Sequence, residues 1–157
     1  MKIEIWAIGK TQDAYIQTGL DHYLKKLKHY LPVDWQVWPD VRSQSHWSPE
    51  QFKQKEGELI LEKLKPGDWL VLLDENGRQF TSEGFAIWME QLLNLSCRRL
   101  IFLIGGAYGF STTIYERADA QLALSKMTFS HQMVRLFFLE QLYRGMSILR
   151  NEPYHNK

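Results

Sequence analysis

Apolar residues occur along this chain in two alternating patterns, short continuous runs and longer stretches with helical spacing. The short runs predict buried strands at residues 2–8, 33–38, 69–73, 99–104 and 121–124. The stretches with helical spacing predict helices at about residues 12–31, 49–64, 82–95, 113–116 and 130–149. Because strands and helices alternate, the pattern predicts an α/β fold class, a mainly parallel sheet with helices on both faces. No repeat or linker interrupts it, so residues 1–157 are expected to form a single domain.

Particular residues mark where several of the predicted helices and loops begin or end. Ser48-Pro-Glu-Gln51 has the composition of a helix start, because the serine can cap the helix and the glutamine can complete a capping box. Pro32 ends the first helix. Residues 39–47 are polar and are expected to form a mobile loop, and residues 74–78 are expected to turn the chain.

Composition and charge exclude several classes of protein. With 157 residues, 45% hydrophobic, the chain is suited to a compact core and is neither disordered nor fibrous. It has no apolar run of membrane-spanning length, and Glu4 lies where a signal peptide would be apolar, so a soluble cytoplasmic protein is expected. The single cysteine, Cys97, has no neighbouring zinc-binding pattern. A net charge of +1 excludes a polycation, although five basic and two acidic side chains after residue 124 suggest an end that faces phosphates.

A glycine turn, Gly105-Gly-Ala-Tyr-Gly109, follows the predicted strand at 99–104. Its spacing differs from the Gly-x-Gly-x-x-Gly of dinucleotide-binding folds, and it follows a late strand instead of the first. The chain also lacks the Gly-Lys-Ser/Thr of a phosphate-binding loop. The turn therefore favours neither dinucleotide binding nor nucleoside triphosphate hydrolysis.

A second loop, Leu124-Ser-Lys-Met-Thr-Phe129, makes the pattern specific. Together with the glycine turn, His131-Gln-Met-Val-Arg135, Glu140-Gln-Leu-Tyr-Arg144 and Pro153-Tyr-His155, it resembles the RlmH family of SPOUT methyltransferases. The resemblance extends from Met1 to the C-terminus. It implies a homodimer with a C-terminal trefoil knot (the SPOUT or α/β-knot fold), S-adenosylmethionine as cofactor and no metal. The implied reaction is methylation of N3 of a pseudouridine in helix 69 of large-subunit (23S) ribosomal RNA, within the assembled ribosome.

The resemblance also implies which residues form the site. The cofactor-binding residues are expected to be Leu73, Gly105, Leu124, Ser125, Lys126, Met127, Thr128 and Phe129. Gly105 would let the backbone approach the ligand, and the apolar side chains would enclose adenine. His155 and Tyr154 are the first candidates at the target base, and Arg144 is the candidate for contact with phosphate or a developing anion.

The last predicted helix leaves alternatives open. His131 and Arg135 lie four residues apart and could act together, although a helix cap is the favoured interpretation of His131. Ion pairing with Glu140 or with an acid of a partner chain is the alternative for Arg135 and Arg144. The broad apolar stripe between Val134 and Leu149 fits a dimer interface and core packing equally well, and the family resemblance favours the dimer.

Two other functions compete with the methyltransferase interpretation. A non-catalytic ribosome-binding protein could keep the fold but would not bind S-adenosylmethionine. An oxidoreductase on a flavodoxin-like sheet would carry a flavin or nicotinamide, and the missing dinucleotide fingerprint weighs against it.

Overall fold

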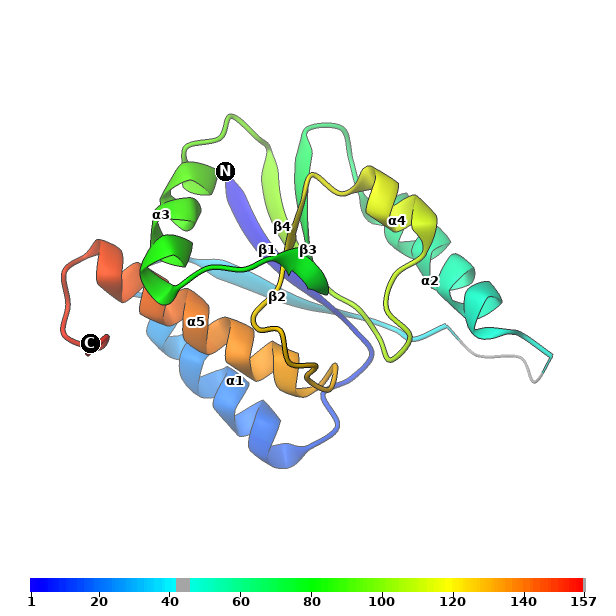
Figure 1. Ribbon diagram of the computed structural model, residues 1–157, viewed down its shortest axis with the longest axis horizontal. Coiled ribbons are helices and arrows are strands. Elements are labelled where there is room, and N and C mark those ends of the chain that lie inside the picture. Colours follow the sequence, from blue (N-terminus) through cyan, green and yellow to red (C-terminus); the bar gives the residue numbers. More distant parts are fainter. Residues whose placement is uncertain (42–45, 157) are drawn as a thin grey trace.

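The centre of the molecule is a parallel β-sheet (Figure 1), seen in a computed structural model that describes residues 1–41 and 46–156. Within these residues the sheet has five strands in the order β2-β1-β4-β3-β5. All neighbouring strands run parallel. The strands are β1 (Lys2–Ile8), β2 (Val33–Trp38), β3 (Asp68–Arg78), β4 (Arg99–Ile104) and β5 (Ala120–Leu122).

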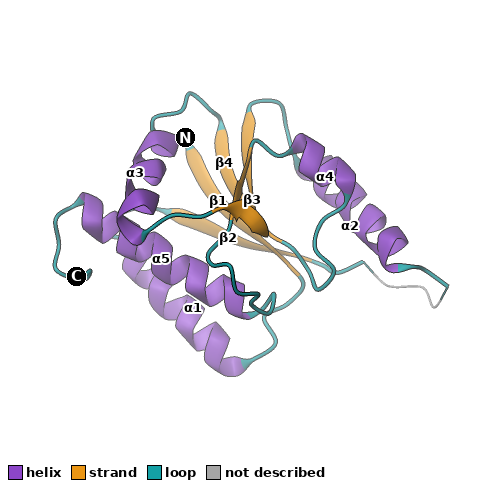
Figure 2. Ribbon diagram, viewed as in Figure 1, coloured by secondary structure: helices purple, strands orange, loops and turns teal. Residues whose placement is uncertain are grey.

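Helices cover both faces of this sheet (Figure 2). They are α1 (Ala14–Leu27), α2 (Pro49–Lys63), α3 (Ser82–Leu93), α4 (Thr112–Arg117) and α5 (Met133–Leu149). α1, α3 and α5 lie on one face, where Leu20, Phe85 and Phe138 pack on inward residues of the strands. α2 and α4 lie on the other, where Ile60 and Ile114 do the same. The predicted α/β class and the parallel sheet with helices on both faces are confirmed.

The predicted start of α2 is confirmed, but α1 ends at Leu27, earlier than the end at residue 31 that Pro32 predicted. The Ser48 hydroxyl accepts a hydrogen bond from the Gln51 N–H, and the Gln51 side chain accepts one from the Ser48 N–H, which completes the predicted capping box. Residues 42–45 of the predicted loop 39–47 lie outside the described residues.

One predicted turn is wrong. Residues 74–78 continue β3 instead of turning the chain, and Arg78 pairs with Leu122 after an irregularity in the ladder. Gly77 permits this, because a Cβ there would lie 2.7 Å from the Leu122 nitrogen. The strand predicted at 121–124 accordingly begins and ends earlier, at Ala120–Leu122. The apolar spacing of the first helix also predicts that Tyr15 is buried, but this residue is 65% exposed.

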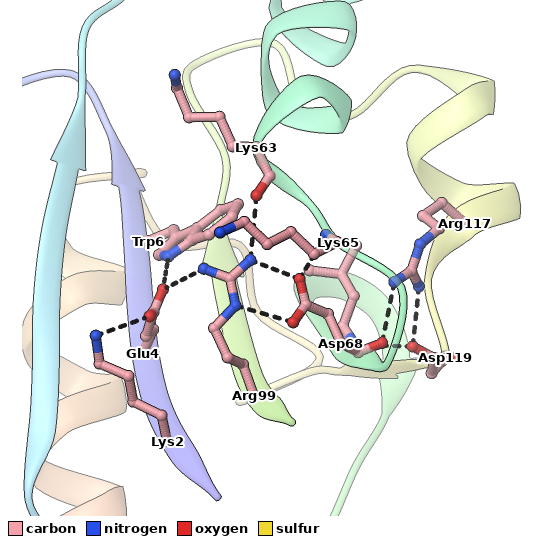
Figure 3. Close-up of polar contacts among 10 residues, drawn as sticks. Lys2, Glu4, Trp6, Lys63, Lys65, Asp68, Arg99, Arg117 and Asp119 are labelled. Atoms are coloured by element: carbon pink, nitrogen blue, oxygen red, sulfur yellow. Dashed lines mark hydrogen bonds and ion pairs between the residues drawn. The ribbon is translucent and has the colours of Figure 1, made fainter. Parts of the chain in front are cut away.

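An ion-pair network joins the amino ends of β1, β3 and β4 (Figure 3). The Arg99 guanidinium contacts Asp68 Oδ2 at 2.6 Å and Glu4 Oε2 at 3.3 Å. Both acids are buried, and Trp6 Nε1 also donates to Glu4 at 2.7 Å. The network lies at the sheet edge opposite to the one where ligands bind in such folds, so we assign it to stability.

Candidate functional site

A cavity of about 390 Å³ opens where the buried part of β3 ends at Leu73 and where β4 ends at Ile104, and both residues line it. The chain leaves β3 toward α3 on one face of the sheet and leaves β4 toward α4 on the other. This divergence opens a crevice between the two strand ends, the usual place for a ligand in an open parallel sheet. The volume is within the range of small-molecule sites.

Most of the predicted cofactor-binding residues lie around this single cavity. Those that line it are Leu73, Gly105, Leu124, Ser125, Met127, Thr128 and Phe129. Lys126, also predicted, is exposed and is not part of the lining. The two loops recognised in the sequence therefore meet in one place, although 18 residues of chain separate Gly105 from Leu124.

The structure gives a second reason for a glycine at position 105, beside the expected approach of the backbone to the ligand. A Cβ at Gly105 would lie 2.9 Å from Cε1 of Phe110, a buried ring that also lines the cavity. The glycine is needed because Phe110 packs beneath the turn. A larger residue at this position would displace Phe110, which itself lines the cavity.

The second loop is tied back to the sheet. The Thr128 hydroxyl donates to Glu75 Oε2 at 2.7 Å, and the Met127 N–H donates to the Ser125 hydroxyl at 3.0 Å. The Ala123 N–H donates to the Arg78 carbonyl at 3.0 Å. Met127 nevertheless stays 75% exposed at the mouth of the cavity, where a ligand can cover it.

Several charged and polar residues of the cavity were not predicted from the sequence. Asp74 and Glu75 line it directly after the buried part of β3, and Lys53 reaches it from α2. The Tyr115 hydroxyl donates to Asp74 Oδ2; burial, followed by this bond, raises the pKa of the tyrosine. Two acids at the carboxyl end of an apolar strand are a sequence signal that could have identified Asp74 and Glu75.

The predicted acceptor-site residues form a second cluster around the end of α5. The Arg144 guanidinium donates to Glu140 Oε1 at 2.5 Å, which raises the pKa of the arginine, and to His155 Nδ1 at 3.1 Å. The other ring nitrogen, Nε2 of His155, lies 3.1 Å from Glu83 Oε1. Since arginine can only donate, the neutral histidine in this arrangement carries its proton on Nε2.

Tyr154 completes this group of residues. We call the group, which consists of Glu83, Glu140, Arg144, Tyr154 and His155, the tail cluster. Its hydroxyl donates to Glu140 Oε1 at 3.1 Å and lies 3.2 Å from the Tyr23 hydroxyl. Burial, together with the hydrogen bond to Tyr23 and the charge of Glu140, raises the pKa of the phenol. Tyr154 is therefore protonated at neutral pH and can act as a hydrogen-bond donor.

Within one chain the tail cluster lies away from the cavity. Val134, which lines the cavity, and Arg144 are ten residues apart on α5. At 1.5 Å per residue this corresponds to about 15 Å along the helix. Figure 1 shows the tail beyond the far end of α5 from the loops that precede the helix. The structure therefore groups Arg144, Tyr154 and His155 but does not bring them to the cofactor residues of the same chain.

His131 and Arg135 have unrelated surroundings. His131 lines the cavity two residues before α5 begins, and it is the Ser130 hydroxyl that accepts a hydrogen bond from the Met133 N–H at 3.1 Å. The interpretation of His131 as the helix cap is wrong. Arg135 is fully buried and donates to the backbone carbonyls of Ile8 and Gly9 at 2.8 Å. It does not pair with Glu140, which instead binds Arg144.

Two kinds of feature are absent from the described residues, a metal-binding cluster and a membrane-spanning helix. Over 1–41 and 46–156 we find no group of three or more histidine, cysteine, aspartate or glutamate side chains arranged to hold a metal. In the same residues no helix has the length and apolar character needed to cross a membrane.

Comparisons with known proteins agree along the whole chain. Residues 1–155 match the family model described as "Predicted SPOUT methyltransferase". The chain is 53% identical to a ribosomal RNA large subunit methyltransferase H of Flavobacterium johnsoniae over 157 residues, all of both chains. Proteins of that name from Parabacteroides distasonis and Christiangramia forsetii are 50% and 49% identical, again over the full length of both chains.

Proposed function

Because the chain belongs to the SPOUT methyltransferase family, we propose that it transfers a methyl group from S-adenosylmethionine to N3 of a pseudouridine in helix 69 of large-subunit ribosomal RNA. The observation that carries this proposal is the cavity at the ends of β3 and β4, where the glycine turn and loop 124–129 meet. The relatives' names support large-subunit ribosomal RNA as the acceptor. The nucleotide and the ring position follow from the resemblance to the RlmH family.

The residues of the cavity fit this methyl donor. Leu73, Leu124 and Met127 provide apolar surface for adenine, and the backbone of the two loops provides donors and acceptors for its edge. The carboxylates of Asp74 and Glu75 suit a ligand with a positive sulfonium and a positive ammonium group. When bound, S-adenosylmethionine supplies a methyl group already activated by its positive sulfur, so this chain's residues need only align the acceptor and manage its proton.

The tail cluster supplies the groups that remove the N3 proton of the target base. In the isolated chain the lone pair of His155 Nδ1 faces Arg144. Entry of the target base breaks this contact, which leaves Nδ1 free to accept the N3 proton. The Arg144 guanidinium, which keeps its contacts with Glu140, then stabilises the negative charge that develops on the ring. Tyr154 turns its one hydroxyl proton from Glu140 to the ring and donates a hydrogen bond there. Glu83 holds Nε2 and orients the imidazole.

A homodimer brings these two parts together. Since Arg144 and the cavity are about 15 Å apart along α5, the tail of one chain has to complete the cavity of another. Phe137 is 41% exposed on α5 and packs on Phe129, so apolar surface beside the cavity is available for such a contact. The trefoil knot and the assignment of all residues to one α/β-knot domain stay predictions.

Methyl transfer to ribosomes tests the proposal. Labelled S-adenosylmethionine is incubated with the protein and with ribosomes that carry or lack the target pseudouridine. We expect label in large-subunit RNA only when the pseudouridine is present. Label elsewhere, or equal label without pseudouridine, would contradict the assigned acceptor. A protein that fails to bind S-adenosylmethionine in calorimetry would favour the non-catalytic ribosome-binding alternative.

A further inference from the structure

Helix α2 lies directly behind the glycine turn that forms one wall of the cavity. The rings of Phe52 on α2 and Tyr108 in the turn have centroids 5.3 Å apart. One turn further along α2, a Cβ at Gly57 would lie 2.5 Å from Oγ of Ser111, so the helix backbone touches the start of α4. The conformation of the turn therefore depends on what α2 presents to it.

Glu56 is the polar group that α2 presents at this contact. Its side chain is buried, with 4% of the residue exposed. A Cβ at Gly106 would lie 3.2 Å from Oε2 and 3.6 Å from Oε1, so the carboxylate packs on the backbone of the turn. The Gly106 N–H lowers the pKa of this carboxyl group, so it favours the ionised form. Within residues 1–41 and 46–156, Oε2 has no hydrogen-bond partner.

The environment of Glu56 makes its charge sensitive to small changes in pH near neutrality. Burial, followed by the negative charge of Asp40 after β2, raises the pKa of Glu56 to about 7, although the Gly106 N–H acts in the opposite direction. Asp40 also interacts with His131 and Arg135. On α2 itself, Lys63 lines a second cavity together with Glu56, and Lys53 lines the large one.

We propose that Glu56 is a positioning residue for the methyl donor. Its ionised carboxylate packs on the backbone of Gly106 and places negative charge behind the turn that faces the positive ligand. This inference rests on the proposed function, because it needs S-adenosylmethionine in the large cavity. Glu56 does not line the cavity, yet in this proposal it affects how tightly the cavity binds S-adenosylmethionine.

Binding and ionisation of Glu56 are then linked. A positive ligand next to Gly106 favours the ionised carboxylate, so binding near neutral pH releases a proton. If only the ionised form binds well, the affinity rises about tenfold between about pH 6 and pH 8, because the ionised fraction rises by that factor. A purely structural role of Glu56 would produce no such release.

Calorimetry of S-adenosylmethionine binding at neutral pH in two buffers of different ionisation enthalpy measures this proton. We expect release from the unchanged protein and from Glu58→Gln, a matched control two residues away that is exposed. We expect no release and a flat pH profile of affinity in Glu56→Gln. Gly106→Ala should reduce the release, because its methyl group displaces the carboxylate.

His131 lines the same cavity, so His131→Asn is the second control. Loss of the proton in His131→Asn but not in Glu56→Gln would overturn the inference, as would binding by the unchanged protein with no proton release. Should Glu56→Gln fail to fold, the pH profile of the unchanged protein and the Gly106→Ala measurement decide the question in the same way. Absence of any binding by the unchanged protein would instead overturn the proposed function, and the inference with it.

Discussion

Arg135 and Arg144 lie on the same helix, and the structure gives each a separate task. The guanidinium of Arg135 is fully buried and donates to the carbonyls of Ile8 and Gly9, which fastens the end of β1 to α5. Arg144 is partly exposed, pairs with Glu140 and touches His155. A fully buried guanidinium whose two terminal nitrogens donate to backbone carbonyls is not available to a substrate. Only Arg144 keeps the accessibility that contact with a developing anion requires.

Truncating Met127 should weaken cofactor binding without affecting folding. The side chain is 75% exposed in the free protein, so Met127→Ala should leave the free energy of unfolding within about 0.5 kcal/mol. Covering this side chain by a ligand contributes about 1.5 kcal/mol or more, so the affinity for S-adenosylmethionine should fall about tenfold. Met127→Leu conserves the apolar volume and should bind nearly as well. If calorimetry gives the same affinity for Met127→Ala and the unchanged protein, this side chain does not contact the ligand.

The raised pKa of Glu56 also predicts a pH dependence of stability. A carboxyl whose pKa rises from 4.5 when unfolded to about 7 when folded binds protons more tightly in the folded state. Its stabilising effect is present below about pH 4.5 and is lost as the pH rises through 7. Glu56→Gln should therefore raise the free energy of unfolding above neutral pH, by up to about 3 kcal/mol.

Urea denaturation at about pH 5 and pH 8 measures the difference in free energy of unfolding between Glu56→Gln and the unchanged protein. Glu58→Gln is the control and should unfold like the unchanged protein at both values. A Glu56→Gln protein whose gain in stability is the same at both pH values would show that Glu56 does not titrate in this range.

At the scale of elements, the two edges of the sheet have separate roles. The carboxyl edge carries the cavity, and there the strand ends are followed by loops that lie open to a ligand. The amino edge is closed by the network of Glu4, Asp68 and Arg99 (Figure 3). Arg99 bridges two acids that are almost completely buried, so the network holds β1, β3 and β4 in register below the cavity.

Removing the central cation of this network should destabilise the protein strongly. Arg99→Ala leaves Glu4 and Asp68 buried without their principal partner, and such a loss costs about 3–5 kcal/mol. Lys2→Ala is the matched comparison, because Lys2 also contacts Glu4, at 3.4 Å, but its side chain is 61% exposed. It should cost less than about 1 kcal/mol. Chemical denaturation of the two variants gives both values, and similar losses would contradict the structural role of Arg99.

At the scale of the whole molecule, the distance between cavity and tail determines the expected assembly. One chain contains both halves of the proposed site, but α5 keeps them apart. Two copies arranged around a twofold axis can each lend a tail to the other. Such an assembly would also double the basic surface of a chain whose own net charge is only +1, and this would help it to hold RNA.

Mixing two inactive variants tests this assembly. Ser125→Trp should fill the cavity, and His155→Ala should remove the proposed proton acceptor, so each variant alone is expected to be inactive. A mixed dimer contains one complete site, formed by the cavity of the His155→Ala chain and the tail of the Ser125→Trp chain. After exchange of subunits at equal amounts, methyl transfer should recover to about a quarter of the original rate. No recovery, in mixtures shown to contain mixed dimers, would mean that each chain works alone.

Predictions from the sequence succeeded where the physical cause is local. The capping box at Ser48 and Gln51 depends on residues three positions apart, and β1, β2 and β4 are marked by their own apolar residues. The continuation of β3 through Arg78 was missed because its pairing partner, Leu122, is far along the chain. The role of Glu56 was also missed, since nothing in its neighbourhood of the sequence indicates that it packs on Gly106.

By itself the sequence determined the alternation of strands and helices, the fold class, the two loops and the family, because apolar spacing and motif order are properties of the chain as written. The tertiary structure decided which residues meet. It brought Leu73, the glycine turn and loop 124–129 to one crevice, and it gathered Arg144, Tyr154 and His155 elsewhere. It also placed Glu56 against Gly106. These contacts depend on how the elements pack, and hydrogen bonds and charges act over a few ångströms of space whatever the separation along the chain.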